Sequence, residues 1–296
     1  NKSSDRNELC NEEALPIVSD INNLIRMLYS KNLSMTSWYG TLPGSERPAR
    51  EGGVKAKLKG ILDKLSNKHV PSVCVGKRNR GPDYEALPGA EDDNRIPWYL
   101  YWEIVWVLTK GPTLKKTDRL LDAGGTASLF TCYMASLGFE VHSIDLKEHL
   151  ISTGNHISKK MGWNMHSYAM NMKKLDFPDN HFDHAFSICV FEHLDYEIKQ
   201  SALTEISRVL KPGGILSITF DFKNPAPAVV KIGADTSSKN QLSNESDIQR
   251  SFLSTGLFEI VGNESFVDNQ KTYLVHPSFG NQPYSFGAIF LRNKKA

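Results

Sequence analysis

From residue 120 onward, short apolar runs alternate with longer amphipathic stretches. The first apolar run ends at Asp122, a glycine pair follows at once, and a helix-like stretch runs from Ser128 to Leu137. Short apolar runs separated by helices are typical of parallel sheets with helices on both faces. We therefore predict an α/β, Rossmann-like domain with a seven-stranded, mostly parallel sheet. Its strands are expected at residues 119–122, 141–145, 165–170, 184–190, 215–220, 258–261 and 285–291.

Residues 1–94 lack this alternation. Apolar residues recur at helical spacing from Ile17 to Leu28 and from Val54 to Leu65, and Pro–Gly stretches lie between and after them. This spacing predicts two amphipathic helices. We therefore divide the chain into a helical N-terminal extension, residues 1–94, and an α/β domain, residues 95–296.

Two acidic residues end consecutive predicted strands. Asp122 precedes the glycine turn, and Asp145 ends the next strand, 23 residues later (145 − 122). In sheets of this kind ligands bind at the carboxyl ends of the strands, where an acid at the tip of the second strand can bond a ribose. An isolated aspartate is often only a helix or turn cap. The spacing and the flanking strands favour a site for an adenosine-containing cofactor.

The glycine pattern narrows the choice of cofactor. A dinucleotide requires the spaced pattern G-x-G-x-x-G at its pyrophosphate. Here Gly124 and Gly125 are adjacent, and Thr126 and Ser128 occupy the later glycine positions. The carboxylate of Asp122 would also repel a pyrophosphate. A cofactor without phosphate and with a positive sulfonium fits better.

Five motifs, in order, resemble those of the class I S-adenosylmethionine-dependent methyltransferases. Asp122 with its glycines matches the first motif, and Asp145 matches the ribose-binding acid. The other three matches are residues 171–183, 187–194 and 210–214, and the resemblance runs from about residue 95 to the C-terminus. It implies S-adenosylmethionine (SAM) as cofactor, S-adenosylhomocysteine as product, and methyltransferase activity for the α/β domain.

The resemblance also implies which residues hold the cofactor. Asn171, where the family often has aspartate, would accept a bond from the adenine amino group, and Thr126 could bond the cofactor through its hydroxyl. Leu146 would pack on the adenine, and the Ile188–Cys189 strand end would offer a backbone carbonyl to the cofactor's amino group. The implied set is Asp122, Ala123, Gly124, Gly125, Thr126, Asp145, Leu146, Asn171, Met172, Ile188 and Cys189.

Methyl transfer from a sulfonium needs mainly the correct placement of donor and acceptor, with a base only where the acceptor must lose a proton. Glu192 and His193 are the candidate catalytic pair, since histidine titrates near neutral pH. The structural alternative is that they open a helix, with Glu192 favoured by the helix dipole. Some quinone-type O-methyltransferases bind a metal through a glutamate at the position of Cys189, so no such metal is expected here.

An unusually aromatic run precedes the first strand of the α/β domain. Members of the resembled family often have a helix there that covers the cofactor, which predicts a lid that contacts the acceptor. The alternative is a helix buried against the sheet, because aromatic residues at this density are usually core. The lid candidates are Arg95, Trp98, Tyr99 and Trp102.

Composition narrows the function classes. The net charge of +2 gives no overall attraction to nucleic acid or membrane. The four cysteines form no C-x-x-C pair, which argues against a zinc knuckle or disulfide framework and favours reduced thiols in the cytoplasm. The longest apolar run, from Trp98 to Leu108, is too short to span a bilayer, which needs about 20 residues.

We expect methyl transfer to an oxygen or nitrogen atom of a small molecule or sugar-like group, with no membrane partner. Residues 47–80 carry ten basic and two acidic residues, a net charge of +8 (10 − 2). They could dock RNA or an anionic acceptor, or form a solvated face, which the scarcity of aromatic residues there favours. The alternatives are therefore an RNA or protein methyltransferase that docks through this region, or a non-catalytic binding subunit that has the SAM-domain fold but a degraded cofactor loop at Thr126 and Ser128.

Overall fold

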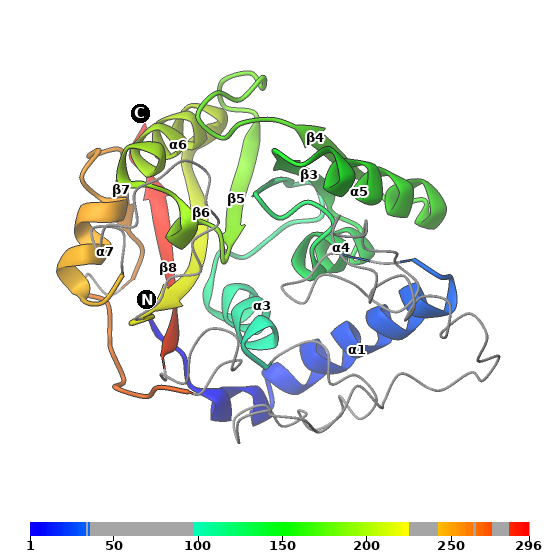
Figure 1. The fold of residues 1–296 in the computed structure, drawn as a ribbon, viewed down its shortest axis with the longest axis horizontal. Coiled ribbons are helices and arrows are strands. Elements are labelled where there is room, and N and C mark those ends of the chain that lie inside the picture. Colours follow the sequence, from blue (N-terminus) through cyan, green and yellow to red (C-terminus); the bar gives the residue numbers. More distant parts are fainter. Residues whose placement is uncertain (34, 36–97, 225–241, 263–264, 274–283, 296) are drawn as a thin grey trace, which may run out of the picture.

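The computed structural model describes residues 1–33, 35, 98–224, 242–262, 265–273 and 284–295. Its centre is an eight-stranded sheet in the order β1-β8-β6-β5-β2-β3-β4, with β7 paired to β8 (Figure 1). The strands are β1 (Lys2–Ser3), β2 (Arg119–Ala123), β3 (Glu140–Asp145), β4 (Met165–Ala169), β5 (Phe182–Ile188), β6 (Leu210–Phe222), β7 (Phe258–Ile260) and β8 (Ser285–Asn293). The helices are η1 (Arg6–Cys10), α1 (Ala14–Ser30), α3 (Trp98–Lys110), α4 (Leu129–Ser136), α5 (Glu148–Met161), η4 (Phe191–His193), α6 (Tyr196–Val209) and α7 (Glu245–Phe252).

The sheet is mostly parallel, as the sequence predicts. Strands β4, β3, β2, β5 and β6 run parallel to their neighbours, whereas β8 is antiparallel to β6, β7 and β1. All seven predicted strands are present. The additional strand, β1, pairs Lys2 with Ala288 and Ser3 with Gly287. A polar strand of two residues has no apolar alternation, so the pattern that predicts the other strands does not detect it.

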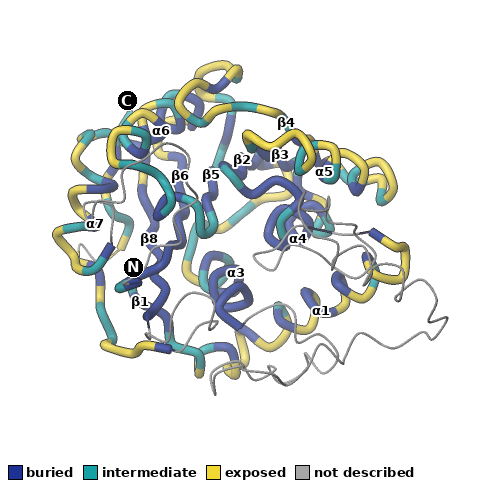
Figure 2. The backbone as a smooth tube through the Cα atoms, in the orientation of Figure 1, coloured by how far each residue is buried: buried dark blue, intermediate teal, exposed yellow. Residues whose placement is uncertain are grey.

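Helices cover both faces of the sheet (Figure 2). The buried side chains of the strands alternate between two cores. In β2, Leu120 belongs to the core beneath α1, α3 and α4, and Leu121 belongs to the core beneath α6 and α7. This is the period of two expected when both faces of a strand are buried. No helix in the described part of the chain is long and apolar enough to cross a membrane.

The N-terminal segment is part of the first core. Helix α1 coincides with the predicted helix at Ile17–Leu28, and its buried face contacts α3 and α4. The Tyr101 hydroxyl donates to Asn22 Oδ1 at 2.7 Å, which ties α3 to α1. The predicted helix at Val54–Leu65, the basic residues 47–80 and the domain boundary at residue 94 lie outside the described residues.

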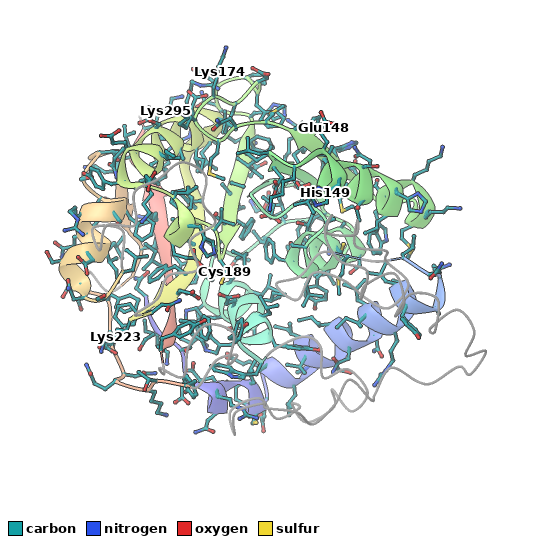
Figure 3. The ribbon with its side chains drawn as sticks, in the orientation of Figure 1. Glu148, His149, Lys174, Cys189, Lys223 and Lys295 are labelled. Carbon is teal, nitrogen blue, oxygen red and sulfur yellow. The ribbon has the colours of Figure 1, made fainter. Side chains whose placement is uncertain are left out.

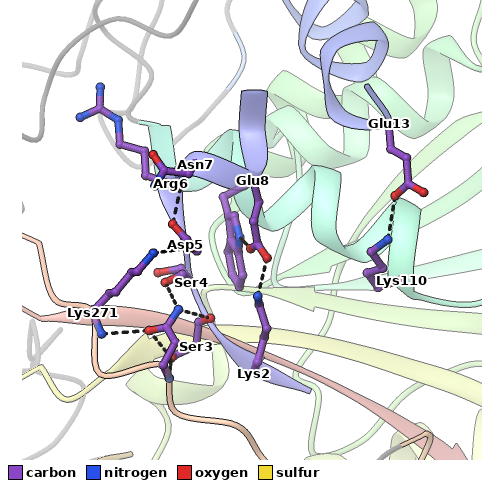
Figure 4. Close-up of polar contacts among 12 residues, drawn as sticks. Lys2, Ser3, Ser4, Asp5, Arg6, Asn7, Glu8, Glu13, Lys110 and Lys271 are labelled. Carbon is purple, nitrogen blue, oxygen red and sulfur yellow. Dashed lines mark hydrogen bonds and ion pairs between the residues drawn. The ribbon is translucent and has the colours of Figure 1, made fainter. Parts of the chain in front are cut away.

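A polar network fixes β1 against the loop that precedes β8 (Figure 4). Asn269 Nδ2 donates to the carbonyl oxygens of Ser3, at 3.2 Å, and Ser4, at 2.8 Å. Asn269 Oδ1 accepts from the Ser3 hydroxyl at 2.9 Å. One amide side chain thus closes the contact between the two ends of the chain.

We expect Asn269→Ala to lower the free energy of unfolding by about 1–3 kcal/mol, because two carbonyl oxygens and a hydroxyl group each lose a hydrogen bond to this side chain. Urea unfolding of the full chain measures the effect. The matched control is Asn23→Ala on the exposed face of α1, where the amide oxygen accepts a long hydrogen bond of 3.4 Å from Arg26. The control should change stability by less than about 0.5 kcal/mol. Equal effects of the two substitutions on the free energy of unfolding would show that Asn269 does not stabilise the contact between β1 and this loop.

Candidate functional site

The loop after β2 requires glycine at two positions. Gly124 has φ +91°, and a Cβ there would lie 2.7 Å from Val190 Cγ1. A Cβ on Gly125 would lie 2.3 Å from both carboxylate oxygens of Asp122. The Gly124 N–H donates to the carbonyl of Ile144 in β3 at 2.9 Å. The loop is therefore held tightly between β3 and the segment that follows β5, with bare backbone in place of side chains.

Asp122 is fully buried beneath this loop. The Thr131 hydroxyl donates to its Oδ2, while Oδ1 has no hydrogen-bond partner among the described residues. Burial raises the pKa of Asp122 to about 7, the nearby Asp145 adds to the increase, and the Thr131 bond opposes it. Ser128 caps α4 by accepting from the Thr131 N–H at 3.1 Å, so it has a structural role at this position.

The end of β3 presents a second group of predicted residues. Asp145 Oδ1 accepts from the Lys147 N–H at 3.0 Å. The next residue, Leu146, is 59% exposed, so its side chain is available to cover a ligand. The Met170 N–H donates to the Asp145 carbonyl at 3.1 Å, which places the segment after β4 beside Asp145.

Asn171 and Met172 follow in that segment. The Asn171 side-chain oxygen accepts from the Lys173 N–H at 3.0 Å, forming a local turn. A carbonyl oxygen can accept a second hydrogen bond, so the predicted bond to an adenine amino group remains available. The structure thus brings the segments that carry Asp145, Leu146 and Asn171 together at one edge of the sheet, and their contact with a cofactor remains a prediction.

The end of β5 has an unusual backbone. Cys189 has φ +52°, which is uncommon for a residue with a side chain. Its N–H is 3.1 Å from both the carbonyl and the hydroxyl oxygen of Thr219 in β6, which holds this conformation. Its thiol donates to Glu103 Oε1 in α3 at 2.6 Å, and Figure 3 places Cys189 between the strand ends and α3. Burial and the surrounding carboxyl groups raise the pKa of the thiol, so it is a poor nucleophile.

Three acidic side chains, Glu103, Glu192 and Asp221, surround Cys189, and we call them the carboxyl cluster. The Asp221 N–H donates to Glu192 Oε1 at 3.3 Å, and Asn224 Nδ2 donates to Asp221 Oδ2 at 2.9 Å. Burial raises the pKa of Glu103 to about 8 and those of Glu192 and Asp221 to about 7. Repulsion between the carboxyl groups adds to the increase for Glu103 and Asp221.

Sequence reasoning identified Glu192 but not Glu103 or Asp221. Both have a visible signal: Glu103 interrupts the longest apolar run, and Asp221 lies at the end of an apolar strand, as Asp122 and Asp145 do. What the sequence does not show is that α3, η4 and β6 bring these three residues together.

Glu192 and His193 lie in η4, separate from α6, whose N-cap is Asp195. Glu192 is buried, and His193 Nε2 lies 3.9 Å from Glu192 Oε1. The structural alternative is that the two residues open a helix. They form a short 3-10 helix of their own and do not begin α6. The Glu192 carboxyl lies beside Cys189 and Asp221, and its catalytic role remains a prediction.

The aromatic lid candidates are buried in the first core. Tyr99 stacks on Phe286 with ring centres 4.1 Å apart, and Trp98 meets Tyr273 edge-on at 4.6 Å. The Trp102 indole donates to Glu8 Oε2 at 2.9 Å. These contacts are those of the buried-helix alternative, and contact of the three rings with an acceptor remains a prediction. Arg95 lies outside the described residues.

Similarity to known proteins identifies the domain. Residues 121–218 match the family model described as "Methyltransferase domain". The chain contains a class I SAM-dependent methyltransferase domain. Among curated proteins, the ubiquinone/menaquinone biosynthesis C-methyltransferase UbiE of Ectopseudomonas mendocina is 34% identical over 124 residues, which cover 39% of this chain and 46% of the relative. That of Vibrio cholerae is 34% identical over 114 residues, covering 36% and 42%. The chain thus spans about half the length of the curated relatives it matches.

Solved structures share the fold of the methyltransferase domain. The cyclase SpnF matches with a TM-score of 0.51 and 20% identity, covering 70% of this chain and 86% of SpnF. The YcgJ protein of Bacillus subtilis matches with a TM-score of 0.50 and 14% identity, covering 66% of this chain and all of YcgJ (100%). At these identities the likeness shows the fold alone.

The cofactor of the methyltransferase domain is SAM, and the residues at the strand ends fit it. The glycine loop offers bare backbone where a Cβ would collide with Val190 or Asp122. The unpartnered Asp122 Oδ1 is a buried acceptor next to this loop, suited to a cation such as the cofactor's amino group. Asp145 would hold the ribose, and Leu146 would cover the adenine.

Asp122→Asn should change how the free energy of unfolding depends on pH. The folded protein retains the Asp122 proton up to about pH 7, whereas the unfolded chain loses it near pH 4. Wild-type stability relative to the variant is therefore fully present below about pH 4 and is lost as the pH rises through 7. Urea unfolding of the cofactor-free protein at pH 5 and pH 8 should show the difference falling by up to about 3 kcal/mol.

Thr131→Val tests the same carboxyl group by removing the hydrogen bond that lowers the pKa of Asp122. Removal of the Thr131 hydroxyl bond should raise the pKa of Asp122 further and move the stability loss to higher pH. An equal difference in free energy of unfolding between the wild type and Asp122→Asn at both pH values would contradict the prediction, because it would show that folded Asp122 does not keep its proton.

Proposed function

We propose that the chain transfers a methyl group from SAM to an oxygen or nitrogen atom of a small-molecule acceptor. The observation that supports this is the contact between the glycine loop and the segment after β5. Val190 lies against Gly124, and the preceding residue, Cys189, touches the carboxyl cluster. A cofactor in the glycine loop would therefore have its neighbouring space lined by acidic groups.

The chemistry suits this arrangement. SAM supplies an activated methyl group, so the protein's main task is to orient the acceptor. An acceptor that must lose a proton also needs a base whose pKa lies near the working pH. Burial raises the pKa of Glu192 to about 7, and His193 is adjacent to it. We assign proton removal to this pair, with Asp221 fixing Glu192 through its backbone N–H.

The burial of the acidic side chains favours a small acceptor. Glu192 and Asp221 are both more than nine-tenths buried, which suits a compact acceptor better than a macromolecular surface. Carbon is the second candidate for the acceptor atom, because the curated relatives are named C-methyltransferases. A carbon activated by loss of a proton from a neighbouring hydroxyl would use the same base. We also infer a cytoplasmic location, for which the free cysteines Cys10, Cys132 and Cys189 are support.

Asp145→Ala should weaken binding of S-adenosylhomocysteine by roughly 10- to 100-fold, the expected loss when a charged hydrogen-bond acceptor for the ribose is removed. Calorimetric titration of the full chain measures this. Asp176→Ala removes an exposed carboxylate from the nearby segment and serves as the control, with affinity expected to be unchanged. If the wild-type chain failed to bind the product, the non-catalytic alternative would be favoured and the proposed activity rejected.

Glu192→Gln should lower kcat by about 100- to 10,000-fold once an acceptor is found, while cofactor affinity stays within about threefold. The acceptor is sought by incubating the protein and methyl-labelled SAM with phenols, amines and sugars. Glu197→Gln, at an exposed position in the first turn of α6, is the matched control and should retain full activity. Equal rates for the two variants would remove Glu192 from the mechanism. Reversing the charges of Lys55, Lys57 and Lys59 tests the RNA or protein alternative through loss of macromolecular binding.

A further inference from the structure

Three side chains at the ends of β5 and β6 converge on one point. Cys189, Glu192 and Asp221 each offer one ligand atom, and these atoms all lie within 4.8 Å of one another. They come from the ends of two neighbouring strands and from η4, so the fold and not a local sequence repeat brings them together. Cys189 is held in its left-handed conformation by Thr219, which directs the thiol to this side.

The same group contains buried oxygens that lack partners. Glu192 is 7% exposed, and its Oε2 has no hydrogen-bond partner in the described part of the chain. Glu103 is 0% exposed, and its Oε2 is likewise unpartnered there. A buried carboxylate without a partner is costly unless a cation or a proton neutralises it. These oxygens are a second observation, separate from the convergence of the ligand atoms, that points to a bound cation.

We propose that Cys189, Glu192 and Asp221 form a binding site for one divalent transition-metal ion of the zinc class. A thiolate is a soft ligand that favours zinc or cobalt and disfavours magnesium and calcium. Zinc bonds to sulfur at about 2.3 Å and to carboxylate oxygen at about 2.0–2.2 Å. Three atoms within 4.8 Å of one another can reach these bond lengths around one ion with small side-chain movements. Three protein ligands leave a fourth position open, as in catalytic zinc sites.

Glu103 would support the site from α3. Its Oε1 accepts from the Cys189 thiol in the absence of metal, and this thiol must lose its proton to become a ligand. Outer groups that contact a metal ligand orient it and tune its affinity. The expectation of no metal rested on the absence of a glutamate at position 189. Carboxyl groups from other elements take the place of that glutamate: Asp221 comes from β6 and Glu103 from α3. Neither residue belongs to the sequence motif around Glu192.

The ion's task in catalysis rests on the proposed function: with an open position beside the cofactor loop, it would bind an acceptor oxygen and favour loss of its proton to His193, the member of the proposed pair that is not a ligand. The site itself does not depend on that function. Ion binding and cofactor binding can therefore be measured separately, and one can fail while the other succeeds.

The test uses the full chain without a histidine tag, freed of metal by chelation. Titration with Co²⁺ should give a sulfur-to-cobalt charge-transfer band that saturates at one equivalent, and Zn²⁺ should abolish the band by competition. Calorimetry with Zn²⁺ should give the same stoichiometry, and Mg²⁺ should not compete. Absence of the cobalt band in the wild-type chain would overturn the proposal.

Variants assign the ligands. Cys189→Ser should remove the cobalt band. Asp221→Asn and Glu192→Gln should each weaken Zn²⁺ binding by at least about 100-fold. Substitution of a group that only contacts a ligand typically weakens binding by about 10- to 100-fold. Glu103→Gln should fall in that smaller range. The control is the double variant Cys10→Ser/Cys74→Ser, which should bind as the wild type does. Loss of the band in this control, with its retention in Cys189→Ser, would place the metal on other thiols and reject the site.

Titration with S-adenosylhomocysteine checks each variant's fold independently of metal. A metal-site variant that keeps product binding is folded, so its loss of zinc is a ligand effect. Zinc binding in a wild-type chain that fails to bind the product would reject the proposed methyl transfer while leaving the ion site in place.

Discussion

The burial of acidic side chains along the carboxyl edge of the sheet is the constraint on which the site depends. Asp122, Glu103, Glu192 and Asp221 are each more than nine-tenths buried, and burial raises the pKa of all four. Burying an ionised carboxyl group costs several kcal/mol, so each must hold a proton or face a cation. The fold accepts this cost at the edge where ligands bind in parallel sheets, and it keeps both faces of the same sheet apolar.

The N-terminal segment contributes to this edge through α3. The helix α3, which carries Glu103 to Cys189, is anchored on both sides. Tyr101 bonds to α1, and Trp102 bonds to Glu8 in η1. The segment from β1 to η1 is in turn fixed by Asn269 near the other end of the chain. The described N-terminal residues are therefore part of the structure that positions one of the acidic groups, in addition to covering the sheet.

The sequence predicts the strands well because each is a short apolar run next to a turn signal. It also identifies the Asp122 loop, since the glycines there are required by contacts with Val190 and Asp122. It misses β1, whose two polar residues depend on pairing with β8: Lys2 pairs with Ala288, 286 positions away (288 − 2). It misses the carboxyl cluster for the same reason: Glu103 meets Cys189 across 86 positions, and periodicity carries no information about such contacts.

Cys189 and Val190 link the two halves of the site. Val190 packs against Gly124 in the cofactor loop, whereas the thiol of Cys189 faces Glu103. Because the two residues are consecutive and the N–H of Cys189 is held by Thr219, neither side chain can move far without disturbing the other. A cation in the carboxyl cluster and a sulfonium in the loop would both relieve uncompensated negative charge, and each would be positioned by this one strand end. We therefore infer that the buried acids on either side of residues 189–190 would fix the positions of both positive charges, and that this would join cofactor binding to the proposed acceptor chemistry.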